Sequence, residues 1–254
     1  MAAEQTPGLV HYLPIASTVL SAIFCSVLLR RWLVRRSGAH LLWWGIGIFF
    51  YGLGTGLESA ITLFGNTAWL TKTWYVAGAL LGGYPLAQGT VFLLLRWRTA
   101  WILTAITLPF LAVAATFVLL SPVDLAQLEA HRPSGSVLVW SWVRLLTPFI
   151  NLYAVVFLIG GAILSSIRYA RGRTAAHRAR ALGNASIAFG AILPGIGGSM
   201  AKAGLVEALY VGELIGLLFI WAGFALCVRA PMGAGASADA EARRTADDPA
   251  PAAA

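Results

Sequence analysis

The sequence predicts an all-α integral membrane protein with seven transmembrane helices. Of its 254 residues, 59% are hydrophobic and 11% are charged, whereas about a quarter of the residues in an average soluble protein are charged. A soluble protein of this size cannot bury so much apolar surface. The apolar residues form runs of about 20, the length that an α-helix needs to cross the hydrocarbon core of a bilayer. The expected spans are 10–30, 41–64, 72–95, 100–120, 144–168, 181–203 and 206–228.

The first span is expected to stay in the mature protein as a membrane helix. A secretory signal peptide carries a basic segment before its apolar core, and none precedes this span. Basic residues follow it instead and act as a stop. They are Arg30, Arg31, Arg35 and Arg36.

Orientation follows from the distribution of basic residues, because short cytoplasmic loops collect Lys and Arg. Fourteen lie in the segments after spans one, three, five and seven. The other side holds Lys72, Arg132, Arg144 and Lys202. We therefore expect the N-terminus outside and the C-terminus in the cytoplasm. The expected location is the cell membrane, as a multi-pass protein of the cytoplasmic membrane of a bacterium. The net charge of +8 reflects these loops and does not indicate a nucleic-acid partner.

Outside the spans the chain leaves little room for another domain. Residues 1–229 are expected to form the seven-helix transmembrane domain. Residues 230–254 are small, polar and proline-bearing, which predicts a disordered cytoplasmic tail. The longest external connection, 121–143, is expected to hold one short interfacial helix ending at Trp140 and Trp142. Most other tryptophans lie near span ends, as interfacial indoles do.

Ordered matches between the two halves of the chain favour an internal duplication. The loop Arg36–His40 corresponds to Arg173–His177 at a displacement of 137. Glycines match between spans two and six and between spans three and seven. The pairs are Gly45 with Gly183, Gly52 with Gly190, Gly82 with Gly216, and Gly89 with Gly223. The expected unit is three helices, with span four as a connector, which makes the two repeats parallel.

This three-plus-one-plus-three organisation resembles the SWEET and PQ-loop transporters and the topology of opsins. The resemblance is architectural and covers all seven spans. The Pro-Gln dipeptide of the PQ-loop group is absent; span three has Pro85 and Gln88, with two residues between them. The hinge prolines of SWEET carriers have counterparts in Pro14, Pro148 and Pro194, but span two has glycines instead. A separate bacterial family of seven-helix proteins is the alternative.

The last span argues against retinal chemistry. A microbial rhodopsin needs a lysine in its middle, and residues 206–228 contain none. No histidine lies at mid-membrane depth, so no haem ligand pair is expected. Motifs of zinc proteases, redox dithiols and serine hydrolases are also missing. The sequence therefore predicts no cofactor and no metal site, and it makes an enzyme the less favoured reading.

Two carboxylates lie within the spans, and each is a functional candidate because an ionised group in a bilayer is costly. Glu58 falls in the outer third of span two, and Glu213 falls in the outer third of span seven. A rise of 1.5 Å per residue places both within about 10 Å of the outer boundary. We expect them to face a cavity that opens to the outside and binds a small polar solute or a cation.

Other polar residues are expected to line the same cavity. Tyr210 shares a helical face with Glu213, and Tyr75 and Lys202 lie at similar depth. The alternative is structural: Glu58 pairs with Lys202, while Glu213 hydrogen-bonds to Tyr75 or another neighbour.

The path is expected to continue toward the cytoplasm past two amide side chains. Gln88, three residues after Pro85, can shape a gate, and Asn184 lies at comparable depth in span six. Helix–helix packing explains both residues equally well. Span six combines Pro194 with several glycines, so it is the helix expected to bend or unwind.

Three functions remain open from the sequence. The first is a carrier or channel-like pathway for a small solute or cation, with the lipid bilayer as its surroundings. The second is a receptor or sensor for an apolar or amphiphilic ligand. The third is a membrane-embedded lipid enzyme. A carrier should align Gln88 and Asn184 with Glu58, whereas a sensor site should end blindly and an enzyme should add a nucleophile. Homo-oligomer formation is left open.

Overall fold

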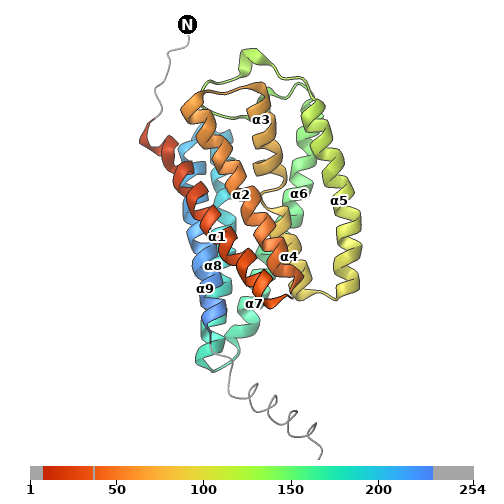
Figure 1. The fold of residues 1–254 in the computed structure, drawn as a ribbon, viewed down its shortest axis with the longest axis vertical. Helices are drawn as coiled ribbons and strands as arrows, with labels where there is room; N and C mark the ends of the chain where they lie inside the picture. The colour runs from red at the N-terminus through yellow and green to blue at the C-terminus, as the bar shows by residue number, and fades with distance from the viewer. Residues whose placement is uncertain (1–7, 37, 231–254) are drawn as a thin grey trace, which may run out of the picture.

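The fold is a bundle of seven membrane-length helical segments that stand side by side (Figure 1). The structure is a computed structural model that describes residues 8–36 and 38–230. From residue 231 on, the predicted tail lies outside the described residues. In these ranges the chain has no β-strand, only an isolated bridge between Val123 and Leu138. The prediction of an all-α protein with seven helices long and apolar enough to span a bilayer is confirmed. These segments are Leu9–Arg35, Ala39–Phe64, Ala68–Leu94, Trp97–Leu120, Ser141–Ala170, Ala175–Ala201 and Glu207–Arg229.

Several of the segments are built from more than one helical element. The elements are η1 (Leu9–Tyr12) and α1 (Leu13–Arg35), α2 (Ala39–Phe64), α3 (Ala68–Trp74), η2 (Tyr75–Leu80) and α4 (Tyr84–Leu94), α5 (Trp97–Leu120), η5 (Ser141–Leu145), α6 (Leu146–Ala154), η6 (Val155–Ile159) and α7 (Gly160–Ala170), α8 (Ala175–Lys202), and α9 (Glu207–Arg229).

Short polar turns begin and end these helices. Thr67 accepts a hydrogen bond from the amide of Leu70 at the start of α3, and Thr174 accepts one from the amide of His177 at the start of α8. Such caps satisfy amides that have no partner inside the helix. Gly65, after α2, has a φ of 88°, which a residue with a side chain rarely adopts.

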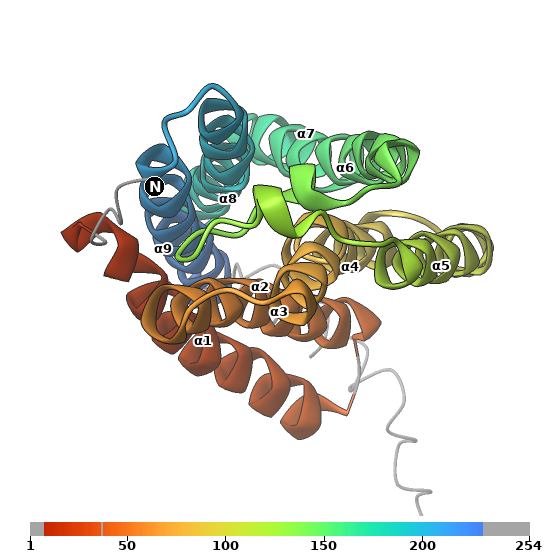
Figure 2. The ribbon, with the colours of Figure 1, turned by 90° about the horizontal axis from the view of Figure 1, so that it is seen from above.

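Two buried apolar clusters hold the bundle together. Seen from above (Figure 2), α1, α2, α8 and α9 lie on one side, and α5 stands at the opposite edge. The first cluster joins α1, α2, α4, η6 and α9 and includes Phe24, Ile48 and Leu217. The second joins η2, α4, α5 and α6 and includes Tyr84 and Leu111. Large apolar side chains also cover the outside of the bundle, as expected where helices face lipid.

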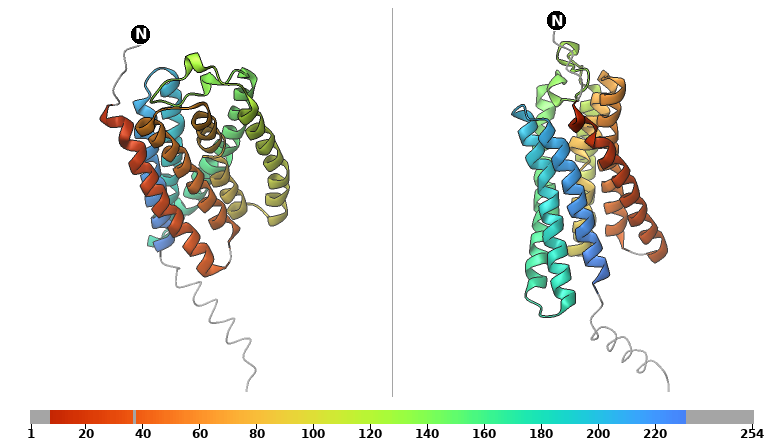
Figure 3. Two further views of the ribbon diagram at one scale, coloured as in Figure 1. Left: turned by 45° about the horizontal axis from the view of Figure 1, so that its top comes forward. Right: turned by 90° about the vertical axis from the view of Figure 1, so that its left-hand side faces the viewer.

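Helices α8 and α9 run alongside each other over their length (Figure 3). Glycines let their backbones approach closely, as small residues do between membrane helices. A Cβ on Gly190 would lie 2.5 Å from the carbonyl oxygen of Gly216, and a Cβ on Gly197 would lie 2.6 Å from that of Ala208. Gly45 and Gly52, the expected repeat partners of Gly183 and Gly190, instead pack on α1. The repeat and the orientation in the membrane stay predictions.

The irregular turns occur in spans three and five and not in span six. Helix α8 is continuous through Pro194, whose ring packs against Gly216 of α9 and so finds room inside the bundle. Span three passes through the π-helical η2 and a turn at 81–83 before Pro85 opens α4. Pro85 has no amide hydrogen to donate to the preceding turn, which favours this break. The expectation that span six would unwind is therefore wrong for this structure.

The expected single helix in the segment 121–143 is also wrong. The segment contains two short 3₁₀ turns, Leu125–Gln127 and Gly135–Val137, and a third, η5, begins at Ser141. Side chains of Asp124 and Ser134 accept hydrogen bonds from backbone amides two residues ahead, and these local bonds compete with a helix. In Figure 2 this segment, which we call the outer loop, crosses over the end of the bundle where α1 begins, hereafter the N-terminal end.

Candidate functional site

Two glutamates from different helices meet near the N-terminal end of the bundle. Glu58 lies six residues before the end of α2 at Phe64, and Glu213 lies six residues after the start of α9 at Glu207. Each is therefore about 9 Å inside its helix end. Their carboxyl groups come within hydrogen-bonding reach of each other. Glu58 is 1% exposed, and Glu213 is half-buried with its Oε2 atom fully enclosed.

Aromatic side chains position this carboxyl pair. The indole Nε1 of Trp74 donates to Oε1 of Glu58 at 2.8 Å, and the hydroxyl of Tyr51 donates to the backbone oxygen of Glu213 at 2.7 Å. Tyr51 lies two helical turns before Glu58, so both face the same side of α2. The indole leaves the second oxygen of Glu58 free, and that oxygen has no donor among the described residues.

Sequence reasoning missed both of these aromatic residues. The spacing between Tyr51 and Glu58 carries a signal, because seven residues return to the same face of a helix. Trp74 carries none: its position near a span end matches an interfacial indole. Its contact with Glu58 depends on how α3 turns back against α2, which the sequence does not reveal.

Replacing Trp74 with phenylalanine is expected to lower the free energy of unfolding by about 1.5–3 kcal/mol, because Glu58 loses a buried hydrogen bond to a group that can be charged. Guanidinium- or SDS-induced unfolding in mixed micelles, followed by circular dichroism, measures this change. Trp69→Phe is the matched control, since Trp69 is an exposed tryptophan of the same helix. Equal losses in the two variants would contradict a specific role for the indole of Trp74.

Buried polar atoms without a hydrogen-bond partner occur on the two helices of the carboxyl pair, on the helix beside them and on the loop at the same end of the bundle. Within the described chain, those atoms come from η1, α1, α2, α9 and the outer loop, and none comes from α3 to α8. Buried polar atoms of this kind are satisfied by ordered water or by a ligand. They are His11 Nδ1, Ser17 Oγ, Ser21 Oγ, Glu58 Oε2, Thr62 Oγ1, His131 Nδ1, the Tyr210 hydroxyl and Glu213 Oε2.

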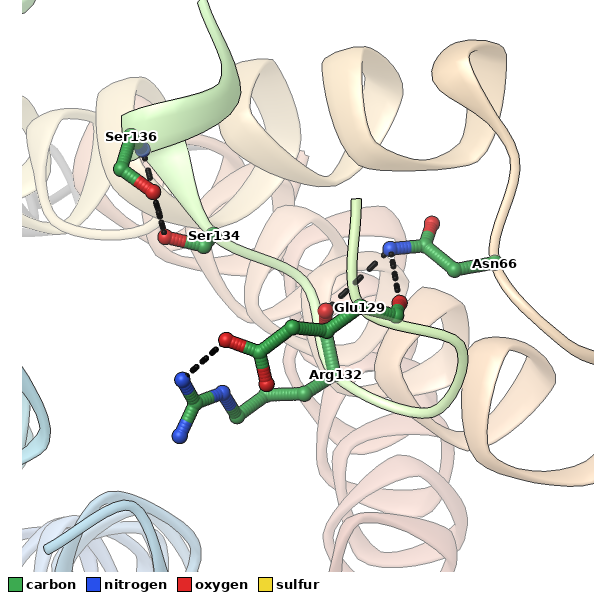
Figure 4. A network of polar contacts seen from close by, with 5 residues as sticks. All are labelled: Asn66, Glu129, Arg132, Ser134 and Ser136. Atoms are coloured by element: carbon green, nitrogen blue, oxygen red, sulfur yellow. Dashed lines mark hydrogen bonds and ion pairs between the residues drawn. The ribbon is translucent and has the colours of Figure 1, made fainter. Parts of the chain in front are cut away.

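The outer loop is fixed over this end of the bundle by Asn66, which lies between α2 and α3 (Figure 4). The amide of Asn66 donates to the backbone oxygens of Glu129 and Arg132, at 3.0 and 3.2 Å. Thr71 holds the Asn66 side chain in turn, at 2.7 Å. Arg132 pairs with Glu129 and also lies near Tyr210 of α9.

Toward the opposite end the site is closed by aromatic packing. Phe24 of α1 stacks on Trp221 of α9, with ring centroids 5.2 Å apart and planes at 6°. Phe224 adds a second contact to Phe24 at 5.5 Å. These rings belong to the first apolar cluster, and they separate the polar atoms from the C-terminal end.

The structure brings together three of the seven residues expected to line one cavity. Glu58, Glu213 and Tyr210 gather at one place, and Tyr210 is 1% exposed. Tyr75 instead contacts the hydroxyl of Thr147 on α6, at 2.8 Å. The side chain of Lys202 lies outside what the structure describes.

The two amide side chains that were expected to continue the path form hydrogen bonds elsewhere in the bundle. Gln88 bonds to Thr104 of α5 and to Tyr153 of α6. Asn184 bonds to the backbone oxygen of Arg180 and to the sulfur of Cys227, near the C-terminal end. Their recorded contacts therefore belong to helix packing and not to the carboxyl pair.

The described residues contain no group of three or more His, Cys, Asp or Glu side chains that could hold a metal ion. Comparison of the chain with protein-family models, curated proteins and solved structures finds no match. The resemblance to PQ-loop transporters and opsins therefore stays a prediction from the sequence.

Proposed function

We propose that this multi-pass membrane protein is a carrier or pathway for a small cation or polar solute that binds at the Glu58–Glu213 carboxyl pair. The observation that supports it most directly is the meeting of two carboxyl groups at membrane depth, from helices far apart in the sequence. Among the described side chains, neither glutamate forms an ion pair with a basic residue; the ion pair found there joins Arg132 to Glu129. Two such groups cannot both be ionised in a low-dielectric interior without a cation between them.

A carrier explains why such a costly arrangement is kept in the membrane. Ionisable residues within spans commonly line ion paths and proton relays. The partnerless polar atoms supply a hydrated approach to the carboxyl pair. We call the stacked rings of Phe24 and Trp221 the aromatic floor. In a carrier that works by alternating access, one conformation is closed on the C-terminal side, and the aromatic floor corresponds to that closure.

The second candidate is a sensor, and the same floor favours it, because a sensor site ends blindly. The polar lining argues against the apolar ligand expected for that class. A lipid enzyme is third, since a nucleophile beside the carboxyl pair would be needed.

Binding is tested by the thermal stability of the purified protein with alkali-metal, divalent and organic cations across about pH 4–9, where a buried carboxylate titrates. We expect stabilisation by a cation, or by protons, in the wild type and loss of that response in Glu58→Gln and Glu213→Gln. Glu207→Gln is the control, because Glu207 is exposed at the start of the same helix. Uptake by proteoliposomes then separates a carrier from a sensor. Identical responses in all four proteins would overturn the proposal.

A further inference from the structure

The partnerless polar atoms lie at successive depths between α1, α2 and α9. The register of α1 against α2 is fixed by two contacts: Thr18 lies 3.0 Å from Thr55 between hydroxyl oxygens, and a Cβ on Gly52 would lie 2.7 Å from the Cβ of Ser21. In this antiparallel pairing Ser17 is level with Gly56, within one turn of Glu58.

Helix α9 runs parallel to α1, and residues of the two helices stay side by side along the bundle. The rings of His11 and Tyr210 meet at 5.8 Å near the N-terminal end, and those of Phe24 and Trp221 meet at 5.2 Å further down. The polar atoms therefore form a column that begins at His11, passes the carboxyl pair and ends at Ser21, one turn above the aromatic floor. We call it the polar column; its members on the helices are Ser17, Ser21, Glu58, Thr62, Tyr210 and Glu213, with His11 at its mouth.

We infer that the cation held by the carboxyl pair is a proton, and that the polar column delivers it through bound water from the N-terminal end alone. This inference rests on the proposed function and names the ion for the same site. In the step itself a carboxylate oxygen takes a proton from a hydronium ion in the column, an O–H bond forms, and a water molecule remains.

The geometry favours a proton over a metal ion. Two neighbouring carboxyl groups can share one proton, which removes the repulsion between them without a further ligand. An alkali or divalent cation takes several oxygen ligands at once. Here the indole of Trp74 already occupies one oxygen of Glu58, and Tyr51 donates to the backbone oxygen of Glu213.

The column also has a chemistry suited to protons. Hydroxyl groups both donate and accept hydrogen bonds, so Ser17, Ser21 and Thr62 can hold a chain of water in either polarity. The aromatic floor offers no such group and blocks the chain at its lower end. The titratable groups that face the pair are Tyr51 of α2 and Tyr210 of α9. His11 of η1 and Arg132 of the outer loop lie near Tyr210 on the approach, whereas Glu207 is exposed at the start of α9 and acts on Tyr210 alone.

Infrared difference spectroscopy of the full-length protein in proteoliposomes tests the inference directly. A pH step should change the carbonyl band of a protonated carboxylic acid in the wild type and in Glu207→Gln. Glu58→Gln and Glu213→Gln should each shift or remove that band, because each breaks the pair that shares the proton and leaves at most one buried carboxylic acid. A band that persists unchanged in both variants would overturn the inference.

The role of the column is read from the rate of protonation after a rapid pH jump. Thr62→Val should slow it roughly tenfold, the effect of about 1.4 kcal/mol on a barrier, while the band itself remains. Thr62 lies one turn beyond Glu58 on α2, between the carboxyl pair and the N-terminal end of the bundle. Ser21→Ala should have no larger effect than Thr62→Val, because Ser21 lies beyond the carboxyl pair, at the closed end of the column. Thr116→Val is the control, because the hydroxyl of Thr116 donates a hydrogen bond to the backbone of its own helix, α5, away from the column. Equal rates in all variants would exclude the column as the route.

Sodium and potassium chloride distinguish the failure of this inference from the failure of the proposed function. If either salt stabilises the wild type and leaves Glu58→Gln unaffected, with no carboxylic acid band, the site binds a metal cation: the proposed function stands and the proton is wrong. If neither protons nor salts act through Glu58 and Glu213, both proposals fail.

Discussion

Replacing Gly190 with alanine is expected to lower the free energy of unfolding by about 1–3 kcal/mol, the usual cost of overpacking a close interface. The added Cβ would lie 2.5 Å from the backbone oxygen of Gly216 and 2.9 Å from the backbone nitrogen of Ile220. Both atoms belong to the backbone of α9, so no side-chain rotation relieves the contact, and α9 must move away from α8.

The same variant should weaken the function of the site. Glu213 lies one turn before Gly216 on α9, so a shift of this helix separates its carboxyl group from Glu58. We therefore expect the pH response of thermal stability to shrink together with the stability itself. Unfolding in mixed micelles and the infrared band of the carboxylic acid measure the two effects.

Gly195→Ala provides the matched control on the same helix. A Cβ at Gly195 meets nothing within 4 Å. Alanine favours a helix over glycine by up to about 1 kcal/mol, so this variant should be as stable as the wild type or more so. A Gly190→Ala protein that matches Gly195→Ala in stability would contradict the close packing of α8 on α9.

The fold was predictable because the bilayer imposes its own length scale. Seven apolar runs long enough to span it predict seven helices regardless of side-chain detail. The outer loop escaped prediction because its shape is set by a distant residue: Asn66 holds the backbone at Glu129 and Arg132. Helix α8 escaped for a related reason, since the glycine that accommodates Pro194 lies on another helix.

The depth of the site residues in the membrane was predictable from the sequence, but the direction in which each side chain faces around its helix axis was not. Counting residues along α2 and α9 places Glu58 and Glu213 at one level, and the structure lets them meet there. Depth alone also groups Tyr75 with them, yet Tyr75 turns to Thr147 on α6. Which side a residue faces depends on the packing of neighbouring helices, and the single sequence carries no measure of that packing.

Replacing Gln88 with leucine is expected to cost about 2–4 kcal/mol of unfolding free energy while leaving the carboxyl-dependent response unchanged. Gln88 is fully buried in α4 and joins three helices: its amide donates to Thr104 of α5 at 2.7 Å, and its carbonyl accepts from Tyr153 of α6 at 2.5 Å. Leucine keeps most of the volume but leaves the hydroxyl of the half-buried Tyr153 without its partner. That loss, and not a cavity, dominates the expected cost.

A double-mutant cycle with Tyr153→Phe separates this network from a role in a transport path. Removing both partners should cost less than the two single changes together, with a coupling of about 0.5–3 kcal/mol, because no buried polar group is then left alone. The infrared band and the cation response should match the wild type in all three variants. If Gln88→Leu abolished either response at unchanged stability, Gln88 would belong to the path from Glu58, and the division between a polar column on α1, α2 and α9 and a packing network on α4, α5 and α6 would be wrong.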